Sequence, residues 1–81
     1  MTAENFHKIQ NIFRQVFEDE TLQLIPELNA NQVIMWDSLT HLNLINEVEQ
    51  AFDIIIPFVE LMEFKNAGDL MNCVDKLLVT P

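Results

Sequence analysis

The sequence has 81 residues, of which 49% are hydrophobic, and its four basic and thirteen acidic side chains give a formal net charge of −9. This length and apolar content fit a single domain, residues 1–81, with one core, and they leave too little chain to enclose a deep substrate cavity as well. The charge repels nucleic acid and anionic membranes and attracts proteins that carry Lys or Arg patches, so a protein partner is expected and nucleic acid is not.

The number of cysteines and the composition of the N-terminus indicate in which cellular compartment the protein is expected. The chain has one cysteine, Cys73, which allows no internal disulfide, and its N-terminus lacks the basic and apolar regions of a signal peptide. No apolar run approaches the roughly 18 residues that a membrane span needs. We therefore expect a cytoplasmic protein without membrane insertion, and the high charge favours a monomer.

Residues 3–17 are expected to form the first helix, because their apolar side chains recur at spacings of three and four. This stripe consists of Phe6, Ile9, Ile12, Phe13, Val16 and Phe17. From Glu18 to Asp37 the pattern is lost, and Pro26 and the polar run "NANQ" indicate a long ordered loop. The apolar side chains expected to pin this loop to the core are Leu22, Leu24, Leu28 and Val33. A loop of this length in a small domain usually has a function or contains a short helix.

The second helix is expected to run from about Ser38 to Phe52. Asp37 is its predicted N-cap, because a carboxylate at that position accepts hydrogen bonds from the free amides of the first turn. The apolar stripe expected to face the core consists of Leu39, Leu42, Ile45, Val48 and Phe52. The residues expected to face water are Thr40, Asn43, Glu47 and Gln50.

The rest of the chain predicts no strand. The run "DIIIP", residues 53–57, has no β partner elsewhere, so an extended connector with alternate isoleucines in the core is expected. Residues 58–64 can form one or two helical turns, and a last helix capped by Asn66 is expected to end at Leu78. The predicted fold is all-α: a small antiparallel bundle of three main helices and one short helix, with a long first loop.

Few residues are candidates for chemistry. His7, His41 and Cys73 do not have the spacing of metal ligands, so no metal site is predicted. Ser38 is different, because a helix N-terminus favours a phosphate ester on an exposed hydroxyl. Asp37, Ser38 and His41 could also be imagined as the acid, nucleophile and base of a hydrolase. That alternative has little support, because residues three apart on a helix do not align readily in those roles and no glycine-rich turn supplies oxyanion donors.

Around Ser38 the sequence resembles the acyl carrier proteins. The signature of that family is Asp-Ser-Leu at the start of its second helix, here Asp37-Ser38-Leu39. The family's second helix ends in Phe and is followed by an extended Ile-x-Ile-Pro segment, which "AFDIIIP" reproduces at residues 51–57. The resemblance extends over nearly the whole chain, including the long loop and the short third helix.

The resemblance implies a non-catalytic carrier that moves acyl or aminoacyl groups between biosynthetic enzymes as thioesters on a flexible arm. It implies that the arm is phosphopantetheine, attached to Ser38 by a phosphopantetheinyl transferase that uses coenzyme A and magnesium. Acyl- or aminoacyl-loading enzymes and downstream synthases would be the further partners, docking on the second helix.

The residues expected to recognise the arm or a partner are Trp36, Asp37, Leu39, Thr40, His41, Asn43 and Glu47. For Leu39, packing in the core stays open as an alternative. Trp36 at such a position is more often a packing residue, and His41 is more often an exposed surface histidine than a pH sensor.

Two features depart from fatty-acid carriers. Met35 and Trp36 stand where many of those carriers have a glycine and a small residue. The first two turns of the second helix lack the family's usual carboxylates, and its acids come later, at Glu47 and Glu49. These departures favour a specialised carrier, of a polyketide, nonribosomal-peptide, cell-envelope, modified-sugar or aminoacyl pathway. The Phe- and Met-containing interior is expected to be full, which favours a short or polar cargo.

An alternative of another class is an unmodified adaptor, an acidic helical protein that keeps the carrier fold and binds partners through its surface. Replacing Ser38 separates the hypotheses. A carrier loses all function in Ser38→Ala and an adaptor keeps partner binding, whereas a hydrolase would also be inactivated by His41→Ala.

Overall fold

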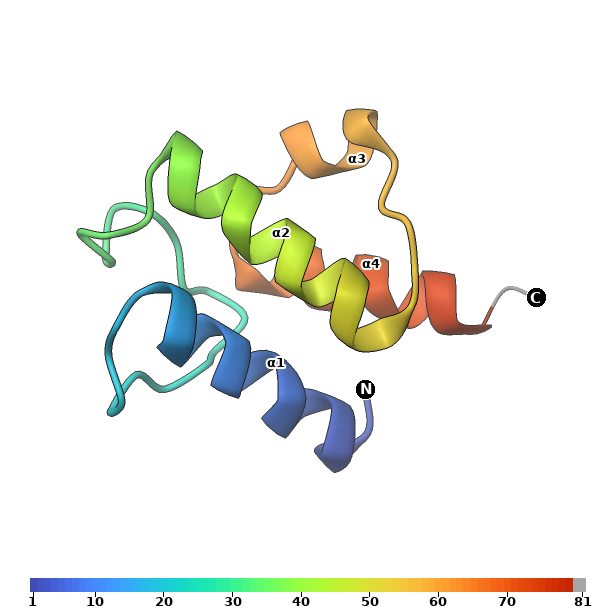
Figure 1. Ribbon diagram of the computed structural model, residues 1–81, viewed down its shortest axis with the longest axis horizontal. Coiled ribbons are helices and arrows are strands. Elements are labelled where there is room, and N and C mark those ends of the chain that lie inside the picture. The colour runs from blue at the N-terminus through green and yellow to red at the C-terminus, as the bar shows by residue number, and fades with distance from the viewer. Residues whose placement is uncertain (80–81) are drawn as a thin grey trace.

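The computed structural model describes residues 1–79 and has four helices in that range (Figure 1). They are α1 (Ala3–Val16), α2 (Ser38–Phe52), α3 (Phe58–Met62) and α4 (Ala67–Val79). No strand occurs among these residues, so the predicted all-α class, with three longer helices and one short helix, is confirmed. Within the same range, no helix combines the length and the apolar character that a membrane span requires.

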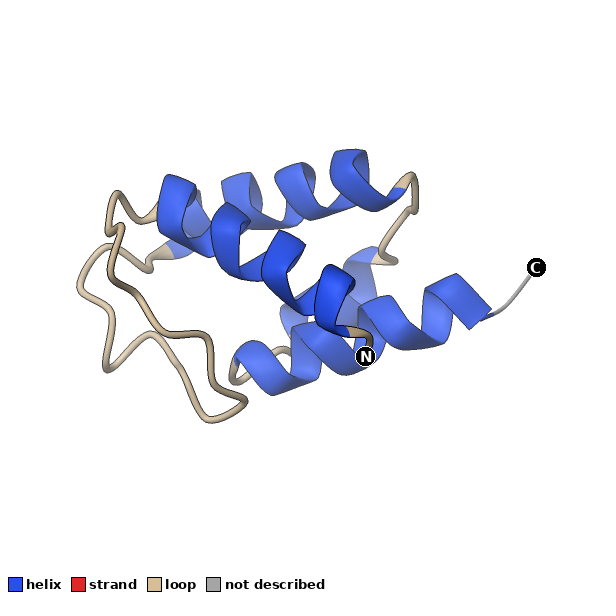
Figure 2. Ribbon diagram, turned by 90° about the horizontal axis from the view of Figure 1, so that it is seen from below, coloured by secondary structure: helices blue, strands red, loops and turns tan. Residues whose placement is uncertain are grey.

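The three longer helices surround one core. In Figure 1, α2 crosses the centre with α1 below it and α3 above it, and Figure 2 shows the long loop at one end of the bundle. The largest side chains that are almost wholly withdrawn from solvent are Ile9, Phe13, Leu44, Val48, Leu70 and Val74. They come from α1, α2 and α4, so these three helices hold one another in place by apolar burial.

The inward face of α2 differs from the predicted stripe. Leu39 and Leu42 are 69% and 53% exposed, so their predicted places in the core are wrong. The face that points inward consists of His41, Leu44, Ile45, Val48 and Phe52. These positions also recur at helical spacing, but the first of them is polar, and that hid the true face in the sequence pattern.

The loop of residues 18–37 is ordered by anchors to α1. Leu22, Leu24 and Leu28 are buried and Val33 packs partly buried against the core, as predicted. The backbone amide of Leu24 donates to the buried Oε1 of Gln10 over 2.9 Å. The loop consists of turns without a helix, so its order comes from these contacts.

The same loop supports the start of α4. The amides of Ala67 and Gly68 donate to the carbonyls of Leu28 and Pro26, each over 2.8 Å. A Cβ added at Gly68 would lie 3.1 Å from both Cβ and O of Pro26, so a larger residue would have to push the loop away by a few tenths of an ångström. The predicted cap is confirmed, because Asn66 Oδ1 accepts from the amide of Asp69 over 2.9 Å.

The connector between α2 and α3 is extended, as predicted. Ile56 is buried, Ile54 is half-buried and Ile55 faces solvent, which is the expected alternation. The carboxylate of Glu49 accepts a hydrogen bond from the amide of Ile56 over 2.8 Å. This contact folds the connector back on α2 and sets where α3 begins.

Candidate functional site

Ser38 is exposed at the first position of α2 and is the only serine in the chain. Asp37 caps the helix as predicted: its Oδ1 accepts from the Thr40 amide over 3.0 Å, and the Thr40 hydroxyl accepts from the Asp37 amide over 2.8 Å. This reciprocal pair is a capping box. The Thr40 hydroxyl also donates to the carbonyl of Met35 over 2.5 Å. Ser38 therefore sits on a turn that is fixed from both sides.

Asp37 is charged at neutral pH. The hydrogen bond from the backbone amide of Thr40 is the largest cause that lowers the pKa of Asp37 below its ordinary value of 3.8. A carboxylate at this position also suits the positive end of the helix dipole. Asp37, which precedes Ser38, is therefore a negatively charged residue whose role in the free protein is to cap α2.

Trp36 lies behind Ser38 and packs into the core. It is buried, and its ring centroid lies 5.6 Å from that of Phe13 and 5.4 Å from that of Phe17. The indole Nε1 donates to Nδ1 of His41 over 3.1 Å. Packing is therefore the role of Trp36 in the free protein, in agreement with the commoner alternative for such a residue.

His41 is not the exposed surface histidine that the sequence favours. It is half-buried, and its Nε2 lies 3.2 Å from the carbonyl oxygen of Leu61 in α3. Because Nδ1 accepts from the indole of Trp36, the proton is assigned to Nε2, which donates to Leu61. Both ring nitrogens are engaged away from Ser38. This geometry argues against a nucleophile–base pair of Ser38 and His41.

A groove of about 570 Å³ lies beside Ser38, between the start of α2, the loop and α3. Its lining residues are Ala30, Trp36, Asp37, Ser38, His41, Leu42, Phe58, Leu61, Met62 and Phe64. Three lining rings contact one another in sequence: Trp36 and His41 are stacked at 20°, and Phe64 meets His41 edge-on with centroids 6.3 Å apart. Trp36 thus belongs both to the lining of the groove and, through Phe13 and Phe17, to the core.

The expected recognition residues divide into three groups. Trp36, Asp37 and His41 line the groove with Ser38. Leu39 and Thr40 lie on the same first turn of α2, the former exposed and the latter engaged in the capping box. A separate shallow hollow, on the side of α2 that faces α1, is lined by Gln15, Val16, Asn43, Asn46 and Glu47. Asn43 and Glu47 are thus not brought together with Ser38.

Sequence reasoning missed the part of the groove that α3 and Leu42 supply. The sequence pattern places Leu42, Met62 and Phe64 in the interior and gives Phe58 and Leu61 no role. Leu42 and Met62 are exposed instead, so their predicted places are wrong, and Phe64 is half-buried. One signal was available: a helix of five residues that is apolar at four of them, "FVELM", cannot bury all of them against one neighbour.

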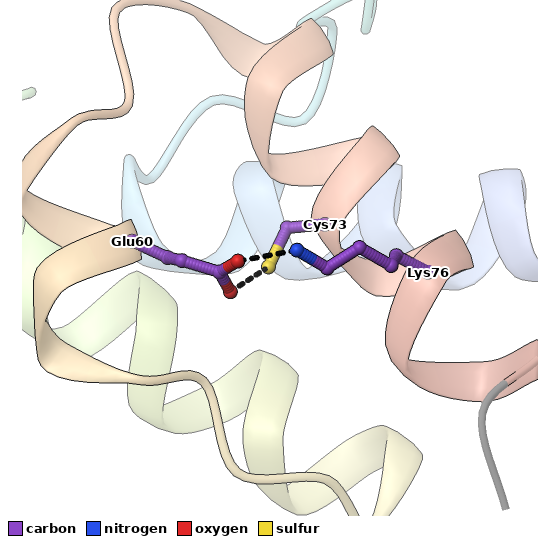
Figure 3. A network of polar contacts seen from close by, with 3 residues as sticks. All are labelled: Glu60, Cys73 and Lys76. Carbon is purple, nitrogen blue, oxygen red and sulfur yellow. Dashed lines mark hydrogen bonds and ion pairs between the residues drawn. The ribbon is translucent and has the colours of Figure 1, made fainter.

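The polar network of Figure 3 fixes α3 to α4. Cys73 donates through Sγ to Oε2 of Glu60 over 3.3 Å, and Lys76 Nζ lies 2.5 Å from Oε1 of the same carboxylate. Burial, and then the hydrogen bond to Glu60, raise the pKa of the Cys73 thiol from 9.0 to about 11. The thiol is buried, as expected of a small core residue, and it is held in its neutral form. No group of three or more metal-ligating side chains occurs among residues 1–79.

Comparison with known proteins agrees with this arrangement. A family model described as "Phosphopantetheine attachment site" matches residues 7–74. The solution structure of a holo acyl carrier protein from Geobacter metallireducens superposes with a TM-score of 0.86, at 42% identity over 95% of this chain and 88% of that chain. An acyl carrier protein candidate from Mycobacterium tuberculosis has a TM-score of 0.80 at 24% identity, over 89% of this chain and 96% of that chain, and shows the shared fold. No curated protein sequence matches at a significant level.

Proposed function

The chain belongs to the family of phosphopantetheine-binding carrier proteins, and from that membership we propose that Ser38 carries the arm and that the protein moves acyl or aminoacyl groups between biosynthetic enzymes. A phosphopantetheinyl transferase is the first partner that family membership implies, followed by enzymes that load the arm and enzymes that use its cargo. The proposal includes a cytoplasmic, monomeric protein. The net charge of −9 and a single cysteine support it.

One observation carries the assignment of Ser38: its hydroxyl is exposed on a turn that the capping box of Asp37 and Thr40 holds rigid. The neighbouring hydroxyl of Thr40 is already committed, since it donates to Met35 and accepts from Asp37. An attachment hydroxyl has to be reached by an enzyme and has to point away from the core. Ser38 meets both requirements.

In the attachment reaction the Ser38 hydroxyl is the only group of this chain whose bonds change. Ser38 Oγ forms a bond to the phosphorus that bears pantetheine, the pyrophosphate bond of coenzyme A breaks, adenosine bisphosphate leaves, and the hydroxyl proton passes to a base of the transferase or to water. Magnesium belongs to the transferase. When bound, the arm supplies a thiol that holds cargo as a thioester.

The protein itself is proposed to be non-catalytic. The engagement of both ring nitrogens of His41 supports this, because the nearest candidate base is already bonded to Trp36 and Leu61. Trp36, which lines the groove, is buried against Phe13 and Phe17, and this packing supports a cargo that stays outside the core. A short or polar cargo suits that arrangement.

The test is the intact mass of the purified protein after incubation with coenzyme A, magnesium and a broad-specificity phosphopantetheinyl transferase. We expect a gain of one phosphopantetheinyl group in the wild type and in Thr21→Ala, which removes an exposed hydroxyl elsewhere. Ser38→Ala should gain nothing. A folded wild-type protein that gains no mass with several active transferases would contradict the proposal and favour the unmodified adaptor.

A further inference from the structure

Exposed apolar side chains gather on the part of the surface that holds Ser38. Among the described residues, eight of the twelve large hydrophobic side chains that are exposed fall between residues 34 and 62, which is the segment from the end of the loop to α3. Three of them, Leu42, Phe58 and Met62, line the same groove as Ser38. Phe58 and Met62 are 68% and 67% exposed, so the free protein leaves them uncovered. Such a concentration marks a surface that another molecule covers.

Carboxylates are scarce in this groove despite the charge of the whole chain. Asp37 is the only acidic residue that lines the groove, and it is engaged with Thr40. Within α3 the one acid, Glu60, is paired with Lys76 and accepts from Cys73. Glu63 follows α3 between the lining residues Met62 and Phe64 and is exposed. A basic patch on a partner would therefore meet a single exposed carboxylate beside the groove and no cluster of them.

Resting on the attachment site proposed above, we propose that partner enzymes dock on this groove by inserting apolar side chains, and not by ion pairing with α2. The groove is continuous with the proposed attachment site, because Ser38 itself lines it. A transferase that reaches Ser38 must therefore cover the groove as well. Aliphatic or aromatic side chains match the lining of Leu42, Phe58 and Met62. A second copy of this chain is the weaker occupant, since each copy carries a net charge of −9.

The groove variants Leu42→Gln and Met62→Gln test this docking. Glutamine keeps helix propensity close to that of Leu and Met while it removes the apolar contact. Leu78→Gln is the matched control, because Leu78 is also exposed on a helix but lies in the last turn of α4 and does not line the groove. Circular dichroism checks that each variant keeps its helices. Phe58→Gln, at the other exposed apolar side chain of the groove, is the replacement if one of these variants does not fold.

The readout is the KM of the apo-protein in modification by a broad-specificity phosphopantetheinyl transferase with coenzyme A and magnesium. We expect each groove variant to raise this KM roughly tenfold, and the control to change it by less than about twofold. Raising the salt from about 50 mM to about 500 mM should change the wild-type KM by less than about threefold, because apolar contacts are not screened.

Three results would overturn the inference. Groove variants that behave like the control, together with a KM that rises steeply with salt, would show ionic docking. A dimer in analytical ultracentrifugation that Leu42→Gln dissociates would assign the groove to a second copy. A wild-type protein that is never modified would contradict the proposed carrier function itself. Modification that proceeds equally well in the wild type and in the groove variants would contradict only the docking proposal.

Discussion

The indole Nε1 of Trp36 donates a hydrogen bond to Nδ1 of His41 over 3.1 Å, and the two rings are stacked at 20°. Through its other nitrogen His41 reaches the carbonyl of Leu61. One side chain thus joins the end of the loop, the second turn of α2 and the end of α3. These are the three segments that surround Ser38, so the shape of the surface beside Ser38 depends on the two hydrogen bonds of His41.

His41→Ala should therefore weaken the fold without preventing modification. It leaves the indole N–H of Trp36 unpaired and breaks the link to Leu61, which should lower the free energy of unfolding by about 1–3 kcal/mol. Urea denaturation followed by the fluorescence of Trp36, the only tryptophan, measures this loss. His7→Ala, at an exposed position of α1, is the control and should change little.

The same variant distinguishes a carrier from a hydrolase. We expect the kcat of transferase modification of Ser38 in His41→Ala to stay within about threefold of wild type, because no base from this chain takes part. The KM is not the readout here, because His41 also lines the groove on which docking is proposed. An esterase activity of the wild type that His41→Ala abolishes would contradict this account.

Gly68→Ala should destabilise the start of α4. Alanine gains helix propensity of up to about 1 kcal/mol, but its Cβ would meet Pro26 at 3.1 Å, and such overpacking costs about 1–3 kcal/mol. The hydrogen bond from the Gly68 amide to the Pro26 carbonyl would also be strained. A net loss of about 1–2 kcal/mol in thermal or urea unfolding is expected. Asn72→Ala, on the exposed side of the same helix, should be neutral or slightly stabilising.

Cys73 should resist thiol reagents in the native protein. With its pKa raised to about 11, the thiolate fraction at pH 8 falls about 100-fold relative to a thiol of pKa 9.0, and burial limits access further. Alkylation by iodoacetamide, followed by mass spectrometry, should be slow in buffer and fast in urea. Equal rates in the two conditions would show that the contact of Cys73 with Glu60 does not hold in solution.

The raised pKa of Cys73 also sets a dependence on alkaline pH. The folded state favours the neutral thiol, so its contribution to stability is complete below pH 9 and is lost as the pH rises toward about 11. Cys73→Ser keeps a donor for Glu60 but does not titrate in this window. The free energy of unfolding should fall less steeply from pH 9 to 11 in Cys73→Ser than in the wild type, and parallel profiles would contradict the assignment.

Asp37 should produce the opposite dependence in acid. Its folded-state pKa lies below 3.8, so its contribution is present above that pH and is lost as the pH falls through the lowered value. Asparagine caps helices as well as aspartate does but does not titrate. Asp37→Asn should therefore keep the helix content of wild type at pH 7, and circular dichroism from pH 5 to pH 2 should show a shallower acid loss. An identical loss in both proteins would place the titration at other carboxylates.

The features that depend on residues close together in the chain could be predicted from the sequence. The Asp37 cap, the Asn66 cap, the alternation at residues 54–56 and the leucine anchors of the loop follow from propensity, spacing and turn residues, and each is confirmed. A serine in the first turn of a helix is common, so Ser38 could be selected only through the resemblance of Asp37-Ser38-Leu39 and the following segment to the carrier signature.

The features that depend on contacts between distant segments, namely the inward face of α2 and the groove beside Ser38, could not be predicted from the sequence. The inward face of α2 begins with His41, and a polar residue enters a buried face only because Trp36 and Leu61 supply its hydrogen-bond partners. Those partners come from the loop and from α3, so no pattern within α2 contains them. The groove was missed for the same reason, since it exists only where three segments meet.

Fragment-ion mass spectrometry of a digest of the transferase-treated protein tests the central claim most directly. The account predicts one modified peptide, with the phosphopantetheine located on Ser38 and none on Thr40, whose hydroxyl is engaged by Met35 and Asp37. A modification found on any other residue, or one that persists in Ser38→Ala, would contradict the assignment of Ser38 as the attachment site.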